Sequence, residues 1–308
     1  MIDSALEYYN FINPNIELIR HSQKMTYKIT DKEKSFALMI HESIHKSPEG
    51  HNSDIEKVER EIEFISNISS KGNLTIPNVI HNKYGNAITL LNKKTPVTVL
   101  EWFDGNVLDK IEITEKIAYE VGLMAGRFHN DCMDMTMKID YLDDVSISKM
   151  CNKTADLLKQ GHFNERQAKI IIDTLKFIGN YFSNNKHKFT IVHGDLSHGN
   201  MLFYDGKVVP IDLTSVCYCI PEIDLAMILG CINNEHLNQQ VLNAYQSVCQ
   251  FKLDYKGIDA CSCLCILLFI VGSNKTFHHK IDDWCENMFM PLINNNTNSW
   301  LRLWKDIF

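Results

Sequence analysis

The sequence predicts an α+β fold in two parts, a strand-rich first part with one main helix and a mostly helical second part. Short apolar runs bounded by polar turns dominate the first hundred residues, as is typical of strands. Apolar residues at helical spacing dominate most of the remaining chain. A turn at residues 103–106 separates the two patterns, so we place the first lobe at residues 1–104 and the second at residues 105–308.

Composition narrows the class of protein. The chain has 308 residues, of which 45% are hydrophobic, and a net charge of −7. This apolar content supports a sizeable core, and the acidic balance argues against a nucleic-acid partner. The first residues lack the basic and apolar regions of a signal peptide, and the longest apolar run, residues 260–272, is too short to cross a bilayer. We therefore expect a cytoplasmic protein without a membrane segment.

The ten cysteines predict neither a zinc site nor a disulfide scaffold. No two of them have the C-x-x-C spacing of a zinc knuckle. Cys261, Cys263 and Cys265 fall within the apolar run, where cysteine behaves as a small hydrophobic residue. We expect reduced, mostly buried thiols.

The first part is predicted as strands around one helix. Residues 16–19, 25–30 and 35–40 have strand character, and so do residues 87–91 and 97–102. Between them, Ser53 and Glu56 fit a capping box at the start of a helix. Its apolar face is then formed by Ile55, Val58, Ile62 and Ile65.

The second part is predicted as helices interrupted by a short β-rich segment. Thr114 is a possible cap for one helix, and Asn164 with Gln167 begins another. Strands are then expected at residues 189–192, 201–204 and 207–211. The last two flank an Asp205-Gly206 turn, which is a strong hairpin indicator.

This β-rich segment contains the residues that indicate chemistry. An apolar strand leads into His193-Gly194-Asp195, Asn200 follows five residues after Asp195, and Asp212 comes twelve residues later. Phosphoryl transfer uses such a set, in which one carboxylate accepts the proton of the attacking hydroxyl while an amide oxygen and a second carboxylate hold Mg²⁺. His193 and Asp195 alone would read as ordinary turn residues. The complete spacing in its strand and loop context favours function.

The segment His-Gly-Asp-Leu-Ser-His-Gly-Asn at residues 193–200, followed by Ile-Asp-Leu at 211–213, resembles the catalytic and metal loops of the aminoglycoside phosphotransferase and choline kinase family. Residues 99–105 are similar to the linker between the lobes of that family. Residues 126–129 and 221–226 are similar to two of its helix motifs. The resemblance implies a protein-kinase-like two-lobe fold with a β-rich N-lobe and a mostly helical C-lobe.

The resemblance also implies roles for residues of the second lobe. By position, Asp195 is the catalytic base, and Asn200 and Asp212 are ligands of Mg²⁺. His193 braces the catalytic loop and Asp224 supports it from the following helix, both in structural roles.

Nucleotide-binding residues follow from the same resemblance. Ala37 and Leu100 border the base, and the backbone of Glu101 and Phe103 contacts it. Glu61 matches the helix glutamate that pairs with the nucleotide lysine of kinases. It is also one of several acids on its helix, so a solvated surface role stays open.

One departure from the family pattern affects nucleotide binding. Strand alternation places Met39 where kinases carry the lysine that holds the α- and β-phosphates, and methionine cannot pair with a phosphate. There are three explanations. The assumed register of this strand against the kinase strand is wrong, or Lys28 or Lys24 supplies the positive charge instead of the strand lysine, or the protein is a degenerate kinase that binds nucleotide poorly. The complete set of Asp195, Asn200 and Asp212 favours substitution. Residues 21–24 also lack the glycines of a phosphate-cradling loop.

The sequence therefore predicts a kinase that transfers the γ-phosphoryl group of ATP or GTP to a small hydroxylated acceptor, with an antibiotic or an amino alcohol favoured. Asp282, Asp283 and Glu286 beside Trp284 would suit a cationic acceptor, or else form a solvated helix face with a buried tryptophan. The alternative function is a non-catalytic, kinase-like binding or scaffold protein, motivated by Met39. A protein kinase is less favoured, because no activation loop follows Asp212.

Overall fold

The computed structural model describes residues 1–21, 24–41, 52–272 and 278–294. The chain forms two compact units, Met1–Asn106 with Tyr204–Thr214, and Val107–Phe203 with Ser215–Phe308. The first unit is built on a β-sheet and the second mainly on helices, so the predicted α+β class is confirmed. Residues 204–214, which lie beyond the sequence boundary at residue 104, group with the first unit and include Asp212.

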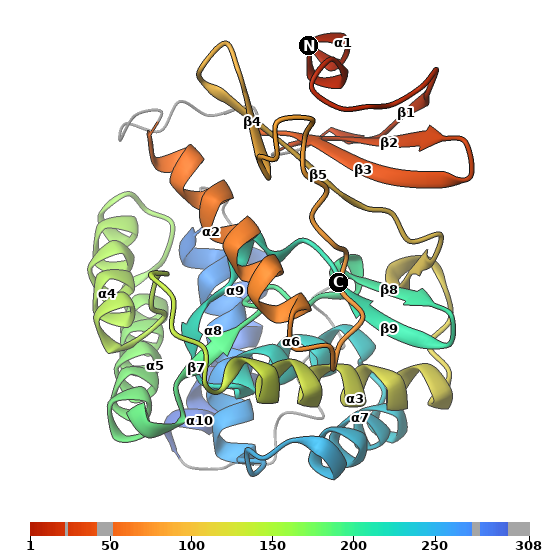
Figure 1. Cartoon of the computed structure of the whole chain (residues 1–308). Helices are drawn as coiled ribbons and strands as arrows, with labels where there is room; N and C mark the ends of the chain where they lie inside the picture. The colour runs from red at the N-terminus through yellow and green to blue at the C-terminus, as the bar shows by residue number, and fades with distance from the viewer. Residues whose placement is uncertain (22–23, 42–51, 273–277, 295–308) are drawn as a thin grey trace. The chain divides into compact units, whose positions relative to one another are not determined.

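The first unit contains a five-stranded antiparallel sheet in the order β1-β2-β3-β5-β4 (Figure 1). Each strand matches an apolar run of the sequence. The bounds are β1 (Asn15–His21), β2 (Met25–Asp31), β3 (Lys34–Ile40), β4 (Ile88–Leu91) and β5 (Thr95–Glu101).

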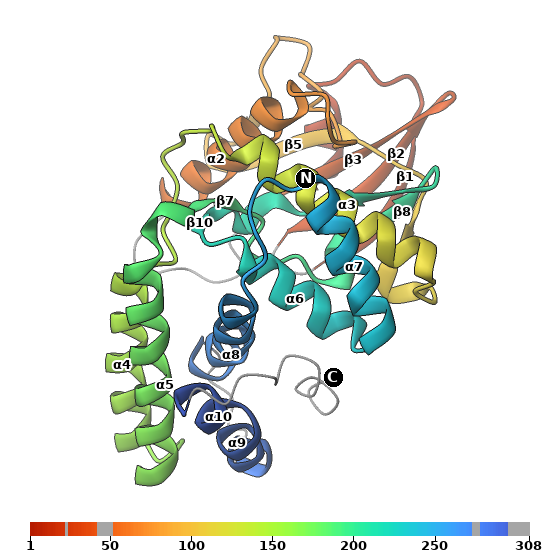
Figure 2. The same ribbon diagram turned by 90° about the horizontal axis from the view of Figure 1, so that it is seen from below.

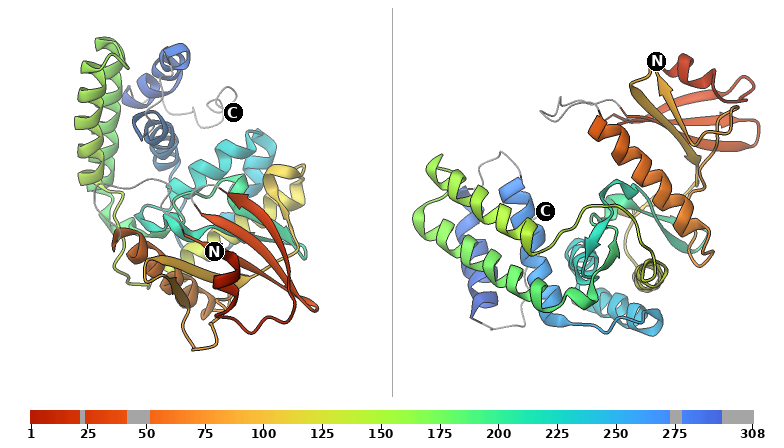
Figure 3. Two further views of the ribbon diagram at one scale, coloured as in Figure 1. Left: turned by 90° about the horizontal axis from the view of Figure 1, so that it is seen from above. Right: turned by 60° about the vertical axis from the view of Figure 1, so that its left-hand side comes forward.

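The two faces of this sheet carry different residues because successive side chains of a strand point to opposite sides. Leu38, Ile40 and Val99 lie on one face and form an apolar core. The short helix α1 (Ile2–Leu6) packs on this core and contacts β4 (Figure 3). Ala37 and Met39 lie on the opposite face.

The helix α2 (Asn52–Ser69) follows β3 and contacts β5. Its apolar stripe is buried, including Val58, Ile62 and Ile65, as the sequence predicts. The predicted capping residue Ser53 lies outside the side chains that the structure describes.

The second unit is mainly helical. Its main helices are α3 (Glu115–Cys132), α4 (Asp144–Lys159), α5 (Glu165–Asn184), α6 (Glu222–Ile232), α7 (Glu235–Val248) and α8 (Tyr255–Gly272). After α8 come α9 (His278–Trp284), a π-helical turn at Cys285–Phe289 and α10 (Met290–Ile293). Figure 2 shows α4 and α5 side by side, and α5 packs against α8.

Two of these helices begin as the sequence predicts. The Thr114 hydroxyl accepts a hydrogen bond from the backbone of Ile117 at the start of α3. Asn164 and Gln167 form a reciprocal capping box at the start of α5. Four orphan donors at a helix start need partners, which explains why these polar residues precede apolar stripes.

Short strands frame the loop that contains Asp195. β7 (Thr190–Val192) ends directly before His193 and pairs antiparallel with β10 (Cys217–Cys219). The predicted hairpin is confirmed as β8 (Met201–Tyr204) and β9 (Lys207–Pro210) around Asp205-Gly206, in a sheet ordered β6-β8-β9, where β6 is Asn106–Val107. The sequence does not predict β10, because three residues are too short for a period to show.

The apolar run of the sequence forms α8. By length and composition α8 is one helix that could cross a membrane, but 72% of its apolar window is buried within the protein. Leu264 and Ile266 pack there in the core of the second unit. All ten cysteines are free thiols, and Cys261 and Cys263 belong to this core, as expected.

Candidate active site

The loop after β7 brings Asp195 and Asn200 together. The Asn200 side-chain amide donates two hydrogen bonds, one to the Asp195 carboxylate and one to its backbone carbonyl, each at 2.8 Å. The short turn His198–Asn200 folds the chain back to make these contacts. Asn200 therefore orients the Asp195 carboxylate, and its own amide oxygen is outside both bonds.

Gly194 is required by the path of this loop. Its backbone lies in the left-handed region with a φ of +77°, and a Cβ at this position would lie 2.4 Å from the backbone oxygen of Ser215. Both features exclude larger residues. The glycine of the His-Gly-Asp motif thus lets the chain turn against the segment that follows Asp212.

Asp224 at the start of α6 anchors the same loop. Its carboxylate accepts hydrogen bonds from the backbone of His193 at 2.8 Å and of Gly194 at 2.9 Å. His129 of α3 contacts Asp224 at 3.1 Å and the Tyr245 hydroxyl at 3.0 Å. The predicted support position of Asp224 and the brace position of His193 thus occur in one buried network. Tyr245, on α7, has no local sequence pattern that would have revealed it.

This network carries a protonated histidine. Burial of the His129 ring opposes the charged form, but hydrogen bonding and charge interactions with Asp224 and Cys249 outweigh it and raise the pKa of His129 to about 9. The pKa of Asp224 is lowered, because the hydrogen bond and charge of His129 outweigh its burial. A buried ion pair with good hydrogen bonds therefore holds the backbone of the loop that contains Asp195.

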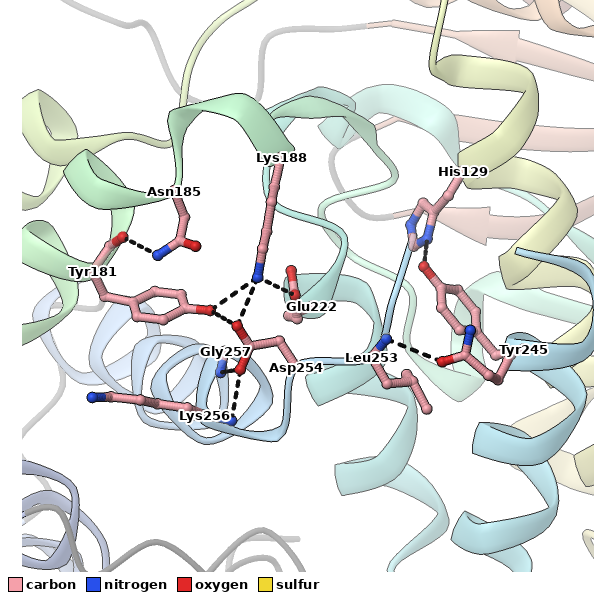
Figure 4. Close-up of polar contacts among 11 residues, drawn as sticks. His129, Tyr181, Asn185, Lys188, Glu222, Tyr245, Leu253, Asp254, Lys256 and Gly257 are labelled. Carbon is pink, nitrogen blue, oxygen red and sulfur yellow. Dashed lines mark hydrogen bonds and ion pairs between the residues drawn. The ribbon is translucent and has the colours of Figure 1, made fainter. Parts of the chain in front are cut away.

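A second polar cluster lies where β7 begins (Figure 4). Lys188, two residues before β7, contacts the Asp254 carboxylate at 2.6 Å and the Glu222 carboxylate at 3.5 Å. The Tyr181 hydroxyl donates to Asp254 at 2.6 Å. Glu222 opens α6 and Asp254 precedes α8, so Lys188 connects the starts of both helices to the strand that leads to Asp195.

The surroundings of Asp195 in the second unit include two thiols. Burial raises the pKa of Cys231 and of Cys265, and the charge of Asp195 adds to the effect on both. Burial also lowers the pKa of His198. These two thiols and the imidazole are therefore uncharged at neutral pH.

The first unit holds a separate charged cluster of Lys24, Glu61 and Asp212, which we call the lysine cluster. The Lys24 ammonium lies 3.0 Å from an Asp212 carboxylate oxygen and 3.6 Å from one of Glu61. The Glu61 side chain is 3% exposed, and its other oxygen, Oε2, has no hydrogen-bond partner among the described residues. Glu61 is thus a buried ion-pair partner and not a solvated surface acid.

Burial and charge together set the protonation of the lysine cluster. Burial lowers the pKa of Lys24, but the two carboxylates outweigh it, so the pKa is raised overall. Burial raises the pKa of Glu61, and the lysine offsets only part of this shift. Burial and the Lys24 charge lower the pKa of His41 to about 3, so His41 is neutral and bonds the Thr98 hydroxyl at 2.9 Å.

Asp212 has an unusual backbone. Its φ is +59°, in the left-handed region that non-glycine residues rarely adopt, and its carboxylate also accepts from the Thr214 hydroxyl at 2.9 Å. Such conformations cluster at functional sites. A carboxylate fits a hard cation such as Mg²⁺, as does the amide oxygen of Asn200. Within the described part of the chain, no group of three or more His, Cys, Asp or Glu side chains forms a metal site.

The predicted base-binding residues lie on β3, on β5 and directly after β5. Ala37 and Leu100 are paired across the two strands. The Glu101 N–H donates to the Asn78 carbonyl at 2.9 Å. Of the two backbone groups of Glu101, the carbonyl is therefore the candidate for a contact with the nucleotide base. Phe103 stacks on Tyr204, with ring centroids 4.9 Å apart.

Lys28 and Met39 are not part of the lysine cluster and have other neighbours. The Lys28 ammonium pairs with Asp104 at 2.5 Å and lies 5.0 Å from the Trp102 ring centroid. Met39 is buried and lies on the same face of β3 as Ala37. Of the two lysines weighed as substitutes, Lys24 is the one that contacts Glu61 and Asp212. Ser22 and Gln23 of the glycine-free turn lie outside the described residues.

The acidic residues near Trp284 have partners within the protein. Asp282 accepts from the Gln167 amide, Asp283 accepts from the Asn287 amide, and Glu286 pairs with Arg166. Trp284 is buried in the core. Asp282, Asp283 and Glu286 thus have protein partners and Trp284 is buried, which favours the alternative of a helix face with a buried tryptophan.

Comparison with known proteins shows the family and the fold of the chain. The sequence profile of the Phosphotransferase enzyme family matches residues 16–256. No curated protein matches the chain in sequence. An amicoumacin kinase in complex with AMP-PNP and Ca²⁺ has a similar structure, with a TM-score of 0.73, 14% identity, and coverage of 98% of this chain and 94% of that one.

Two further solved structures are similar over nearly their whole length. A microcompartment-associated aminopropanol kinase has a TM-score of 0.67 at 16% identity and covers 98% of both chains. A spectinomycin phosphotransferase in complex with ADP and spectinomycin has a TM-score of 0.66 at 14% identity and covers 97% of both chains. The family profile spans most of the sequence, so this chain belongs to the Phosphotransferase enzyme family and is a small-molecule phosphotransferase with a kinase-like fold.

Proposed function

We propose that the protein transfers the γ-phosphoryl group of ATP or GTP to a hydroxyl of a small acceptor, with Asp195 as the catalytic base. The observation that carries this proposal is the geometry of the catalytic loop. Asn200 bonds the Asp195 carboxylate at 2.8 Å, and Asp224 fixes the loop backbone through His193 and Gly194. A base must be held in one orientation to accept a proton during the reaction.

In the proposed step, the acceptor hydroxyl oxygen forms a bond to the γ-phosphorus. The bond between that phosphorus and the β,γ-bridging oxygen breaks, and the nucleoside diphosphate leaves with its electron pair. Asp195 accepts the hydroxyl proton. Asn200 and Asp212 are the proposed ligands of Mg²⁺, which supplies neutralisation of phosphate charge when bound.

The other proposed nucleotide contacts lie in the first unit. Ala37 and Leu100 border the base, and Glu101 and Phe103 offer backbone groups to it. The pairing of Ala37 with Leu100 across β3 and β5 supports this assignment. Lys28 lies on the same face, paired with Ala37 in register, and is proposed to contact the nucleotide away from Glu61.

An amino alcohol or a hydroxylated antibiotic is the acceptor class we propose to test first. The similar structures include kinases of aminopropanol and amicoumacin and a spectinomycin phosphotransferase. The scaffold alternative rested on the missing strand lysine. It loses that support because an ammonium group, that of Lys24, does contact Glu61 and Asp212.

The test is a phosphoryl-transfer assay on the full chain. Mg²⁺ with ATP or GTP is combined with aminopropanol, choline, spectinomycin, kanamycin and amicoumacin, and products are identified by the added mass of one phosphoryl group. For an acceptor that reacts, Asp195→Asn should lower kcat by about 10²- to 10⁴-fold. The affinity for nucleotide should stay unchanged, because the Asp195 carboxylate is proposed to contact the acceptor and not the nucleotide.

The matched control is Asp156→Asn, which removes an exposed carboxylate on α4 that pairs with Lys159. We expect kcat of this variant to equal that of the wild type. Retention of full activity by Asp195→Asn would remove the proposed base. Failure of the protein to bind either nucleotide with Mg²⁺ would contradict the proposed reaction as a whole.

A further inference from the structure

The lysine cluster indicates how this chain manages without the strand lysine of kinases. Met39 occupies the expected position on β3, is buried and carries no charge. Thr26 of β2 pairs with Met39 in register. Lys24 lies in the turn two residues before Thr26, and its ammonium reaches Glu61 and Asp212.

Lys24 makes the contacts that such a lysine requires. Its ammonium lies 3.6 Å from Glu61, the buried carboxylate of α2, and 3.0 Å from Asp212, the proposed ligand of Mg²⁺. The side chain is long enough to reach over one residue pair of the sheet, since four methylene groups separate the backbone from the charge. Contact with a metal-ligand candidate places the ammonium where phosphate oxygens would bind.

The lysine cluster contains more acidic than basic side chains. One ammonium group faces two carboxylates, and in the described part of the chain Glu61 Oε2 has no hydrogen-bond partner. Lys24 is 15% exposed and Asp212 is 31% exposed, so the lysine cluster is not closed to a ligand. A cluster that served only to stabilise the unit would gain little from a buried carboxylate oxygen without a donor.

We propose that Lys24, from the turn before β2, holds the phosphates of the bound nucleotide in place of the missing lysine on β3, with Glu61 as its positioning partner. The proposal rests on the kinase function proposed above and deepens its nucleotide site. Met39 then fills an apolar position below the lysine and makes no contact with phosphate.

The test measures binding of AMP-PNP and GMP-PNP to the full chain, with and without Mg²⁺, by calorimetry. Lys24→Met should weaken binding of the nucleotide that binds wild type by about 10- to 100-fold, as loss of a hydrogen bond to a charged group implies. In the Lys24→Met background, Met39→Lys returns an ammonium to the strand position and should recover at least part of the affinity.

Two further variants separate binding from folding. Lys83→Met removes a lysine of the same unit whose ammonium bonds the Glu7 carbonyl, and should bind nucleotide as the wild type does. Lys24→Met combined with Glu61→Gln removes both partners of the buried pair. It keeps the protein folded for measurement if Lys24→Met alone does not fold, and it should show the same loss of affinity.

The outcomes show whether Lys24 or Lys28 is the lysine that binds phosphate. Unchanged affinity in a folded Lys24→Met protein, or a larger loss in Lys28→Met than in Lys24→Met, would overturn the proposal. So would failure of Met39→Lys to recover any affinity. These measurements involve no acceptor, so a protein that phosphorylates nothing can still support the role of Lys24. Conversely, the Asp195→Asn assay can fail while Lys24 binding stands.

Discussion

At the residue scale, the contacts of a charged group depend on where the folded chain places it and not on its position in the sequence. The chain places Met39 on the strand where an ammonium is expected, and Lys24 reaches Glu61 and Asp212 from the neighbouring turn. Two adjacent antiparallel strands bring residues far apart in sequence onto one face. A long, flexible side chain in the turn before β2 can therefore carry its charge to Glu61 and Asp212.

His129 gives a pH-dependent stability. Its pKa is raised from 6.5 to about 9 in the folded chain, so folding takes up a proton between these values. The stabilisation is complete below pH of about 6.5 and is lost as the pH rises through about 9, with a total on the order of 3 kcal/mol. Urea unfolding of the wild type from pH 6 to 9.5 should show this decrease.

His129→Gln keeps a hydrogen-bonding side chain without the titration. The difference in unfolding free energy between wild type and His129→Gln should therefore shrink as the pH rises, which cancels contributions from other groups. A constant difference across this range would show that His129 is not protonated in the native protein.

At the scale of elements, Lys188 connects β7 to the starts of α6 and α8 (Figure 4). Lys188→Met leaves the buried Glu222 and the Asp254 carboxylate without their cation. We expect a loss of about 1–3 kcal/mol in the free energy of unfolding, measured in urea. The loss in Lys188→Met with Glu222→Gln should be smaller than the sum of the single variants, because the two groups interact.

An exposed ion pair provides the control. Lys159→Met breaks the surface pair with Asp156 on α4 and should change stability by about 0.5 kcal/mol or less. Equal effects of Lys159→Met and Lys188→Met would mean that the Lys188 contacts do not support β7.

Elements with strong local patterns could be predicted from the sequence. The caps of α3 and α5 and the Asp205-Gly206 hairpin depend on hydrogen bonds and turn preferences of adjacent residues, so a short window of sequence contains them. The loop that contains Asp195 and Asn200 could be predicted for the same reason, since these two residues are five positions apart. β10 and α1 could not, because such short elements form only through contacts with β7 and with the sheet core.

At the scale of the whole molecule, the chain divides into two units, and each unit is made of two separate segments of the sequence. Residues 204–214 return to the first unit, where Tyr204 stacks on Phe103 and Asp212 pairs with Lys24. A composition boundary is a single position, whereas a compact unit can recruit a distant segment through side-chain contacts.

The core of the second unit includes α8, which explains the long apolar run of this helix. Leu264 is fully buried there, so Leu264→Ala should lower the free energy of unfolding by about 2–5 kcal/mol. Val145→Ala, at an exposed position on α4, should change it by about 0.5 kcal/mol or less. Equal effects in urea unfolding would show that α8 is not part of this core.

The sequence by itself determined the α+β class, the strands of the main sheet, the helices α2, α3, α5 and α8, and the loop that holds Asp195 and Asn200, because these depend on periodicity, caps and spacing within short windows. The sequence left open whether Glu61 is a surface acid or an ion-pair partner, and whether Lys24 or Lys28 lies near it. The tertiary structure shows that Glu61 is a buried ion-pair partner and that its contact is with Lys24. A lysine's partners are set by which strands and helices fold against it, and the residues that contact Lys24 are 37 and 188 positions away in the chain.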